Sequence, residues 1–126
     1  MTLLLDTGAL VAYERGSKRV QAFLEAARKR GERVRTTTPV VAQAWRGGPR
    51  SAPVARLLHG VDEVAFSPER ARAVGALLAA ARTADVVDAS VIEVAGDGDE
   101  VLTSDPADLA VLAAAAGKTL IVTLIS

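Results

Sequence analysis

Short runs rich in aliphatic and β-branched residues alternate with longer segments in which apolar residues recur at helical spacing. The short runs predict strands, at 2–5, 33–37, 63–66, 100–103 and 119–124. The longer segments predict helices, at 7–13, 17–30, 38–45, 52–58, 67–82, 85–95 and 105–116. Such alternation predicts one domain over residues 1–126, a three-layer α/β/α sandwich with a central, mainly parallel five-stranded sheet.

Composition narrows the class of protein. The 126 residues include no Cys, which excludes disulfides, thiolate nucleophiles and Cys-ligated zinc. Half of the residues are hydrophobic, and few are aromatic, so we expect an aliphatic core. No apolar run approaches the ~20 residues that span a bilayer, and the first residues lack the features of a secretory signal. We therefore expect a cytoplasmic protein that does not enter a membrane.

Charge is divided between the two halves of the chain. Residues 1–60 hold eleven Lys and Arg against four Asp and Glu, and residues 61–126 hold four against eleven. Most of the basic residues are Arg, whose planar guanidinium suits phosphate groups. The first half therefore suits a polyanion and the second half suits cations.

Five acids are expected at one edge of the sheet. Asp6 follows the first strand, Asp85 and Asp88 open a helix, and Asp105 and Asp108 follow the fourth strand. In a parallel sheet the strand ends and the following helix starts share an edge, where ligands bind. Clustered carboxylates repel one another and favour a hard cation such as Mg²⁺ or Mn²⁺. Each acid at a helix start can also serve only as a cap.

Four sequence blocks resemble a known family. The blocks are LLLDTGALVAY, TTPVVAQAWRGG, DVVDASVIEVA and TSDPADLAVLA, which lie at 3–13, 37–48, 85–95 and 103–113. In order and spacing they are similar to the motifs of the PIN domain, and most similar to VapC-type toxins of bacterial toxin–antitoxin pairs. The resemblance covers nearly the whole chain.

The resemblance implies a Mg²⁺- or Mn²⁺-dependent endoribonuclease that hydrolyses RNA phosphodiester bonds. It also implies a homodimer and a cognate antitoxin whose tail covers the active site. Asp6, Asp88 and Asp105 match three catalytic, metal-binding acids of the family, and Asp108 matches an additional metal ligand. The residues with supporting roles are Thr7, Gln43, Asp85 and Thr103.

One matched position departs from the family. The second acid is typically a Glu, and here that position holds Gln43, which keeps an oxygen ligand but loses the charge. We do not expect Glu14 to replace it, because Glu14 is more readily solvated or paired with Arg15 or Lys18. In an active enzyme, an activated water would attack the scissile phosphate. Arg46 and Arg50 flank a Gly-Gly-Pro turn and are expected to contact the RNA backbone.

Other functions remain open at this stage. Gln43 favours a catalytically weak module that binds RNA or an antitoxin. A receiver-like phosphorylation domain has a similar length, but no Lys follows the fifth strand. A dinucleotide-binding domain lacks its Gly-rich motif after the first strand. Trp45 and His59 are expected to be structural or exposed rather than catalytic.

Overall fold

The computed structural model describes residues 1–125, and its centre is a parallel sheet in the order β3-β2-β1-β4-β5. The strands are β1 (Thr2–Leu5), β2 (Arg33–Thr37), β3 (Asp62–Val64), β4 (Glu100–Thr103) and β5 (Ile121–Leu124). Every pairing between neighbouring strands in this part of the chain is parallel. The predicted parallel five-stranded sheet is confirmed.

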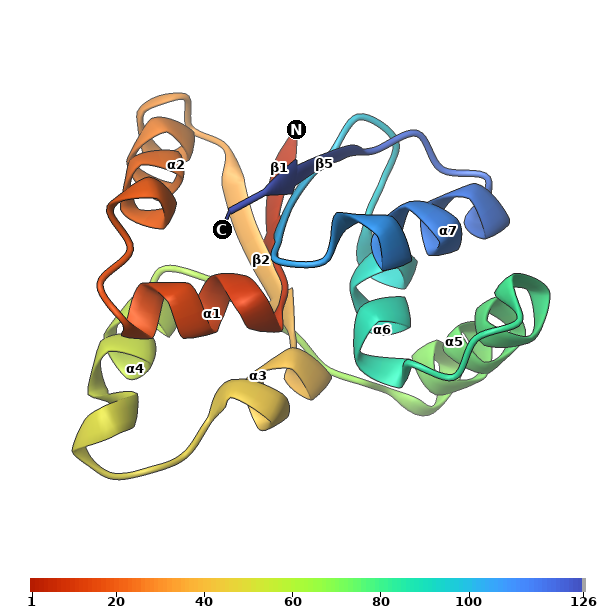
Figure 1. Ribbon diagram of the computed structural model, residues 1–126, viewed down its shortest axis with the longest axis horizontal. Helices are drawn as coiled ribbons and strands as arrows, with labels where there is room; N and C mark the ends of the chain where they lie inside the picture. Colours follow the sequence, from red (N-terminus) through yellow and green to blue (C-terminus); the bar gives the residue numbers. More distant parts are fainter. Residues whose placement is uncertain (126) are drawn as a thin grey trace.

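Helices cover both faces of the sheet and complete the three predicted layers. They are α1 (Thr7–Glu14), α2 (Lys18–Lys29), α3 (Thr38–Ala44), η1 (Pro49–Ser51), α4 (Ala52–Leu58), α5 (Pro68–Ala81), α6 (Val86–Val94) and α7 (Pro106–Ala116). Figure 1 shows α1, α2 and α4 on one side of the strands, and α5, α6 and α7 on the other. Within residues 1–125, no helix combines the length and apolarity that a membrane crossing requires.

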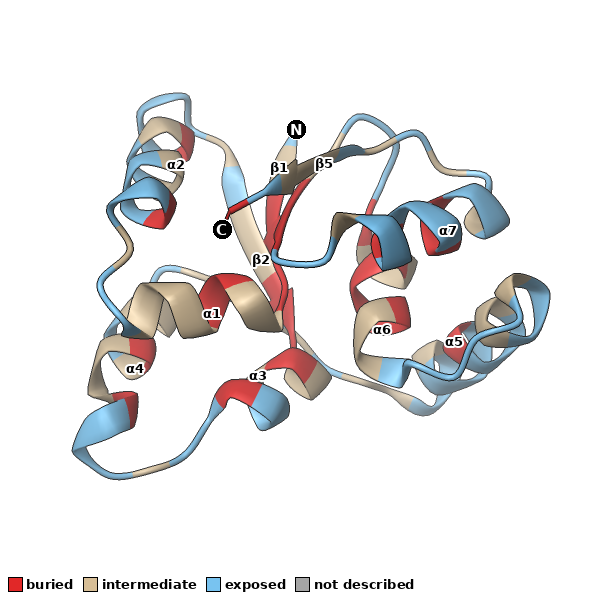
Figure 2. Ribbon diagram, viewed as in Figure 1, coloured by how far each residue is buried: buried red, intermediate tan, exposed pale blue. Residues whose placement is uncertain are grey.

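The core is aliphatic, as the composition predicted. Leu4 and Leu5 of β1 and Leu102 of β4 are fully buried, and they belong to one hydrophobic cluster that also contains Leu10 of α1 and Ile92 of α6. In Figure 2 the buried residues concentrate on the central strands and on the helix faces that meet them. Burial of each such side chain stabilises the fold by about 1.5–3 kcal/mol. The central strands are therefore a firm base for the residues at their ends.

Some predicted boundaries were wrong, for local reasons. The third strand covers Asp62–Val64 instead of 63–66, because the Phe66 N–H donates to the Thr38 hydroxyl at 3.0 Å. The fifth strand begins at Ile121 instead of 119, because the Thr119 N–H donates to an Asp97 side chain at 2.7 Å.

Helix α3 is capped by Thr37, whose hydroxyl accepts the Val40 N–H at 3.4 Å. The helix then ends at Ala44, because the Trp45 backbone is extended.

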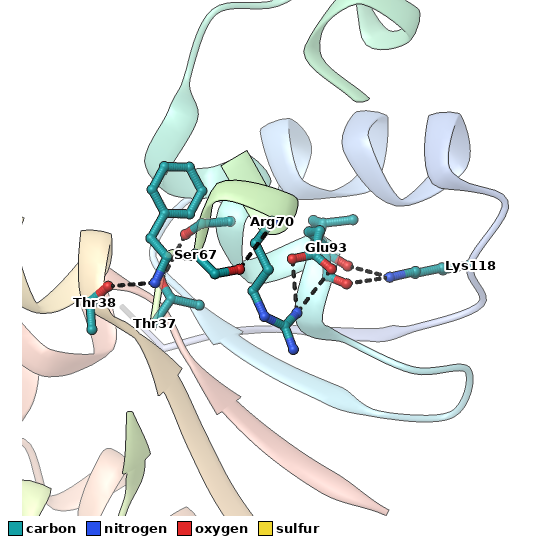
Figure 3. A network of polar contacts seen from close by, with 9 residues as sticks. Thr37, Thr38, Ser67, Arg70, Glu93 and Lys118 are labelled. Atoms are coloured by element: carbon teal, nitrogen blue, oxygen red, sulfur yellow. Dashed lines mark hydrogen bonds and ion pairs between the residues drawn. The ribbon is translucent and has the colours of Figure 1, made fainter. Parts of the chain in front are cut away.

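A polar network fixes α6 between its neighbours (Figure 3). Arg70 of α5 donates to both carboxylate oxygens of Glu93 at 2.9 and 3.0 Å. The Lys118 ammonium donates to the carbonyls of Ile92 and Glu93 at 2.8 and 2.9 Å, which satisfies groups at the C-terminal end of α6. At the middle of α6, the Ser90 hydroxyl hydrogen-bonds to that of Thr37 at 2.7 Å. This network holds the helix that carries Asp88.

Candidate functional site

Two neighbouring strands end in acidic turns at the carboxyl edge of the sheet. Asp6 follows β1 directly, and Asp105 follows β4 after Ser104. The strands are paired through Leu5 and Leu102, and the Asp6 N–H donates to the Leu102 carbonyl at 3.3 Å. The two acids therefore leave the sheet side by side, as the sequence predicted for this edge.

Asp6 is a buried carboxylate held by backbone donors. It is 5% exposed, and its Oδ1 accepts the Ala9 N–H at 2.9 Å, which caps α1. Burial raises the pKa of Asp6, and the nearby charge of Asp105 also raises it. Hydrogen bonds from Thr103 and from the backbone of Ala9 and Gly8 act in the opposite direction. The fixed position of Asp6 suits a residue that orients a ligand.

Thr103 links the two acidic turns. It is fully buried at the end of β4, and its Oγ1 accepts the Asp105 N–H at 2.8 Å. The same hydroxyl lies near enough to the Asp6 carboxyl to lower its pKa. Thr103 thus fixes the backbone of Asp105 beside Asp6, which suits the supporting role predicted for Thr103.

Asp88 lies among the charges of the other predicted acids. We call this edge of the sheet the acidic edge, and its members are Asp6, Asp85, Asp88, Asp105 and Asp108. The pKa of Asp88 is raised from 3.8 to about 7, first by burial and then by the charges of Asp85, Asp6, Asp105 and Asp108. All four of the other predicted acids therefore act on Asp88. The five acids that the sequence placed at this edge are thus near enough for four of them to act on the charge of the fifth, and each of these charges raises the pKa of Asp88.

The remaining acids differ in their local roles. Asp85 caps α6, and its Oδ1 accepts the Asp88 N–H at 2.9 Å. Asp105 occupies the cap position of α7 but makes no side-chain cap hydrogen bond. Its carboxyl instead interacts with that of Asp108, and this interaction raises the pKa of Asp108. Asp85 thus has a structural function as the cap of α6, whereas Asp105 interacts with another carboxyl.

The chemistry of these carboxylate side chains fits a hard divalent cation. Carboxylate oxygens are the ligands that Mg²⁺ and Mn²⁺ prefer, and Asp88 is poorly satisfied as an anion among other acids. In residues 1–125, however, no three acidic or His side chains lie close enough together to form a ready-made metal site. Metal binding at this edge therefore requires the carboxylates to draw closer than they stand here.

Gln43 reaches the acidic edge from α3. Its Oε1 accepts the Thr7 hydroxyl at 2.6 Å, next to Asp6 in the first turn of α1. The family resemblance implied that Thr7 supports the acids. In the structure the Thr7 hydroxyl donates to the neutral amide of Gln43. The amide oxygen of Gln43 is therefore already engaged within the protein.

The predicted RNA-binding arginines lie in a turn that is tied to the fold. The Ser51 hydroxyl accepts the N–H groups of Arg46 and Gly47, both at 3.0 Å. The Arg50 Nε donates to Glu14 at 2.8 Å, and the Glu14 side chain is only 9% exposed. The expectation that Glu14 is solvated or pairs with Arg15 or Lys18 was wrong, because its partner comes from a distant turn. Both predicted arginines remain exposed at the surface.

Two residues at this edge were not singled out from the sequence. Gly8, in the first turn of α1, packs directly against Ser104, and a Cβ at Gly8 would overlap the Ser104 hydroxyl oxygen. The sequence signal for this contact is Gly8 itself, a residue of low helix propensity inside a predicted helix.

A cavity of about 750 Å³ lies elsewhere on the protein. It opens among α2, β2, α4 and β3, with a lining that includes Leu24, Leu57 and Val61. Among the residues that the structure describes, none of the five acids contributes to this lining. The cavity is therefore separate from the acidic edge.

Comparisons with known proteins identify the fold. No family model matches the sequence, and no curated protein matches it. VapBC2 from Rickettsia felis, solved bound to a promoter DNA fragment, is similar to this chain with a TM-score of 0.70 and 13% identity. That match covers 98% of this chain and 99% of the other. FitAB bound to the IR36 DNA fragment is similar with a TM-score of 0.63 and 16% identity, over 95% and 94% of the two chains.

These findings correct the identification drawn from the sequence blocks. The assignment to the PIN-domain family, as a VapC-type toxin, is not upheld, because no family model matches and the two likenesses show a shared fold alone. The physical reason is that a strand followed by a capping acid recurs in parallel α/β folds. In this chain Asp6 and Asp85, which anchor two of the blocks, are both helix caps.

Proposed function

We propose that this chain is one component of a toxin–antitoxin pair and that it binds the other component as its protein partner. The observation that supports this proposal is the likeness to chains of VapBC2 and FitAB, which extends over nearly the full length of each chain compared.

We further propose that the acidic edge binds Mg²⁺ or Mn²⁺ and hydrolyses RNA phosphodiester bonds. Asp6, Asp88 and Asp105 would hold the cation, with Asp108 as an additional ligand. The raised pKa of Asp88 carries this proposal, since a carboxylate surrounded by four others is stabilised by a divalent cation. When bound, such a cation supplies Lewis acidity at a phosphoryl oxygen and lowers the pKa of a water molecule.

The chain's own residues would perform the other tasks. Asp6 is held in place by the Ala9 N–H, so it would present its carboxylate to the cation at a fixed position. One of the carboxylates would accept the proton of the attacking water. Arg46 and Arg50, on their anchored turn, would contact phosphates along the RNA backbone and position it without reading its sequence.

A second candidate function is a catalytically weak module that binds RNA or an antitoxin. Gln43 favours it, because a neutral amide at this edge, already bonded to Thr7, adds no charge for a metal ion. Within residues 1–125 the acids lie too far apart to form a ready-made metal site, which also favours a catalytically weak module.

One experiment separates these candidates. Purified wild-type protein is incubated with a pool of structured RNAs and Mn²⁺, beside Asp88→Asn, Gln43→Glu and the control Glu25→Gln. Glu25 is an exposed carboxylate on α2, so its loss has the same charge effect away from the site. Hydrolysis predicts cleavage that Asp88→Asn abolishes and Glu25→Gln retains. A folded wild type that never cleaves, while Gln43→Glu does, would establish the binding module.

The partner is tested separately. A small reading frame adjacent to the gene is coexpressed with the tagged chain. We expect its product to copurify with the wild type and to relieve any growth arrest that the chain causes. A chain that neither arrests growth nor retains that product would contradict the assignment to a toxin–antitoxin pair.

A further inference from the structure

Two uncharged residues, Gly8 and Ser104, bring the two acidic turns into close contact. Gly8 lies in the first turn of α1, two residues after Asp6, and Ser104 directly precedes Asp105. A Cβ built on Gly8 would overlap Ser104 Oγ, and would lie 2.8 Å from Ser104 Cβ and 3.1 Å from its backbone nitrogen. These distances leave no room for any side chain at Gly8.

The neighbouring backbone cannot easily yield to such a side chain. The turn before Gly8 is tied to β4 by the hydrogen bond from Asp6 N–H to the Leu102 carbonyl. The turn after Thr103 is tied by the bond from Asp105 N–H to the Thr103 hydroxyl. The Ala9 N–H, next to Gly8, donates to the Asp6 carboxyl at 2.9 Å. A methyl group at Gly8 would therefore push apart the segments that carry Asp6 and Asp105.

Helix propensity gives no reason for glycine at this position. Ala is the best helix former and Gly is among the worst, so an unconstrained position in α1 would favour Ala. The φ angle of Gly8 is not in the left-handed region, so the backbone does not require glycine either. Close packing against Ser104 is the one feature at this position that excludes other residues.

We propose that Gly8 is a positioning residue for the acidic site: its contact with Ser104 keeps the turns that carry Asp6 and Asp105 close enough for both carboxylates to move onto one divalent cation. This inference rests on the proposed metal binding. In this role Gly8 touches neither cation nor substrate. It acts through Asp6 and Asp105, the two acids that follow β1 and β4.

The test measures Mn²⁺ affinity of the full chain by titration calorimetry. Three variants are compared with the wild type: Gly8→Ala, Gly75→Ala and the double variant Gly8→Ala with Ser104→Gly. Gly75 is the matched control, because it also lies within a helix and a Cβ there meets nothing within 4 Å. Circular dichroism establishes that each variant is folded.

We expect Gly8→Ala to weaken Mn²⁺ binding by about tenfold or more, the size of effect seen when groups that orient metal ligands are lost. Gly75→Ala should bind as the wild type does. Ser104→Gly removes the two atoms that a Cβ at Gly8 would meet first, so the double variant should recover most of the affinity. Should Gly8→Ala fail to fold, Ser104→Thr adds bulk from the opposite side of the contact and should weaken binding in the same way.

The possible outcomes separate this inference from the proposed function. Wild-type binding that Gly8→Ala leaves unchanged, or that Ser104→Gly fails to restore, overturns the role of Gly8 and leaves metal binding intact. Absence of binding by the wild type overturns the metal site itself. In that case crystal structures of metal-free wild type and Gly8→Ala decide the positioning role, and an unchanged separation of Asp6 from Asp105 overturns it.

Discussion

Replacing Asp88 by Asn should stabilise the metal-free protein at neutral pH. In the folded chain the Asp88 carboxylate is partly buried beside Asp85, Asp6, Asp105 and Asp108, and its pKa rises from 3.8 to about 7. Asn has nearly the same shape but no charge to desolvate or repel. Its backbone N–H remains available to the Asp85 cap, so α6 keeps its first turn.

The size of the effect follows from the change in pKa. A carboxyl fully sheltered from water whose pKa rises from 3.8 to about 7 would lose about 4 kcal/mol of stability when ionised. Asp88 is only partly buried, and solvent screening reduces such interactions strongly. We therefore expect Asp88→Asn to raise the free energy of unfolding by about 1–2 kcal/mol at neutral pH.

The sign of the pH dependence can be stated directly. Between pH 3.8 and about 7, Asp88 is ionised in the unfolded chain and protonated in the folded one. The folded state thus binds the proton more tightly, and the contribution of Asp88 to stability falls as pH rises through this window. The advantage of Asn should be complete above about pH 7 and should disappear below the ordinary pKa of the carboxyl.

Urea unfolding followed by circular dichroism measures this difference. Wild type, Asp88→Asn and the control Glu25→Gln are compared without metal at about pH 8 and about pH 4. The control should be close to wild type at both values, because Glu25 is exposed. Equal stability of wild type and Asp88→Asn at the higher pH, or a gain of the same size at the lower pH, would refute the electrostatic reasoning.

Three further predictions concern the frame of the site and its assembly. Thr103→Val should lower the free energy of unfolding by about 1–3 kcal/mol, since it leaves the Asp105 N–H without its hydroxyl acceptor, and chemical denaturation measures this. Glu93→Gln should lower the free energy of unfolding by about 1–3 kcal/mol, because it replaces a two-oxygen acceptor for Arg70 by a neutral amide. The control Glu25→Gln should lower it by less. The homodimer predicted from the sequence should give twice the 13.0 kDa chain mass by light scattering, and a mass of one chain would contradict it.

The fold could be predicted from the sequence because its signals are local. Aliphatic runs at β1 and β4 are too short for helices, and capping residues such as Ser67 and Asp85 mark where helices begin. The errors occur where a distant side chain intervenes. Asp97 captures the Thr119 N–H, for example, and so delays the start of β5.

The candidate site could be predicted only in part. The convergence of the five acids follows from topology, since parallel strands end at one edge. The partner of Gln43 could not be predicted, because the bond from Thr7 depends on how α3 packs against α1. The pairing of Glu14 with Arg50 depends likewise on the path of a turn. Neither contact is encoded in the spacing of residues along the chain.

The most direct test of the acidic site is anomalous scattering from a crystal grown with Mn²⁺. We expect a single strong peak bounded by the carboxylates of Asp6, Asp88 and Asp105, with these side chains drawn closer together than in the metal-free protein. A well-ordered crystal at saturating Mn²⁺ with no peak at this edge would contradict metal binding there, and with it the proposed hydrolysis of RNA.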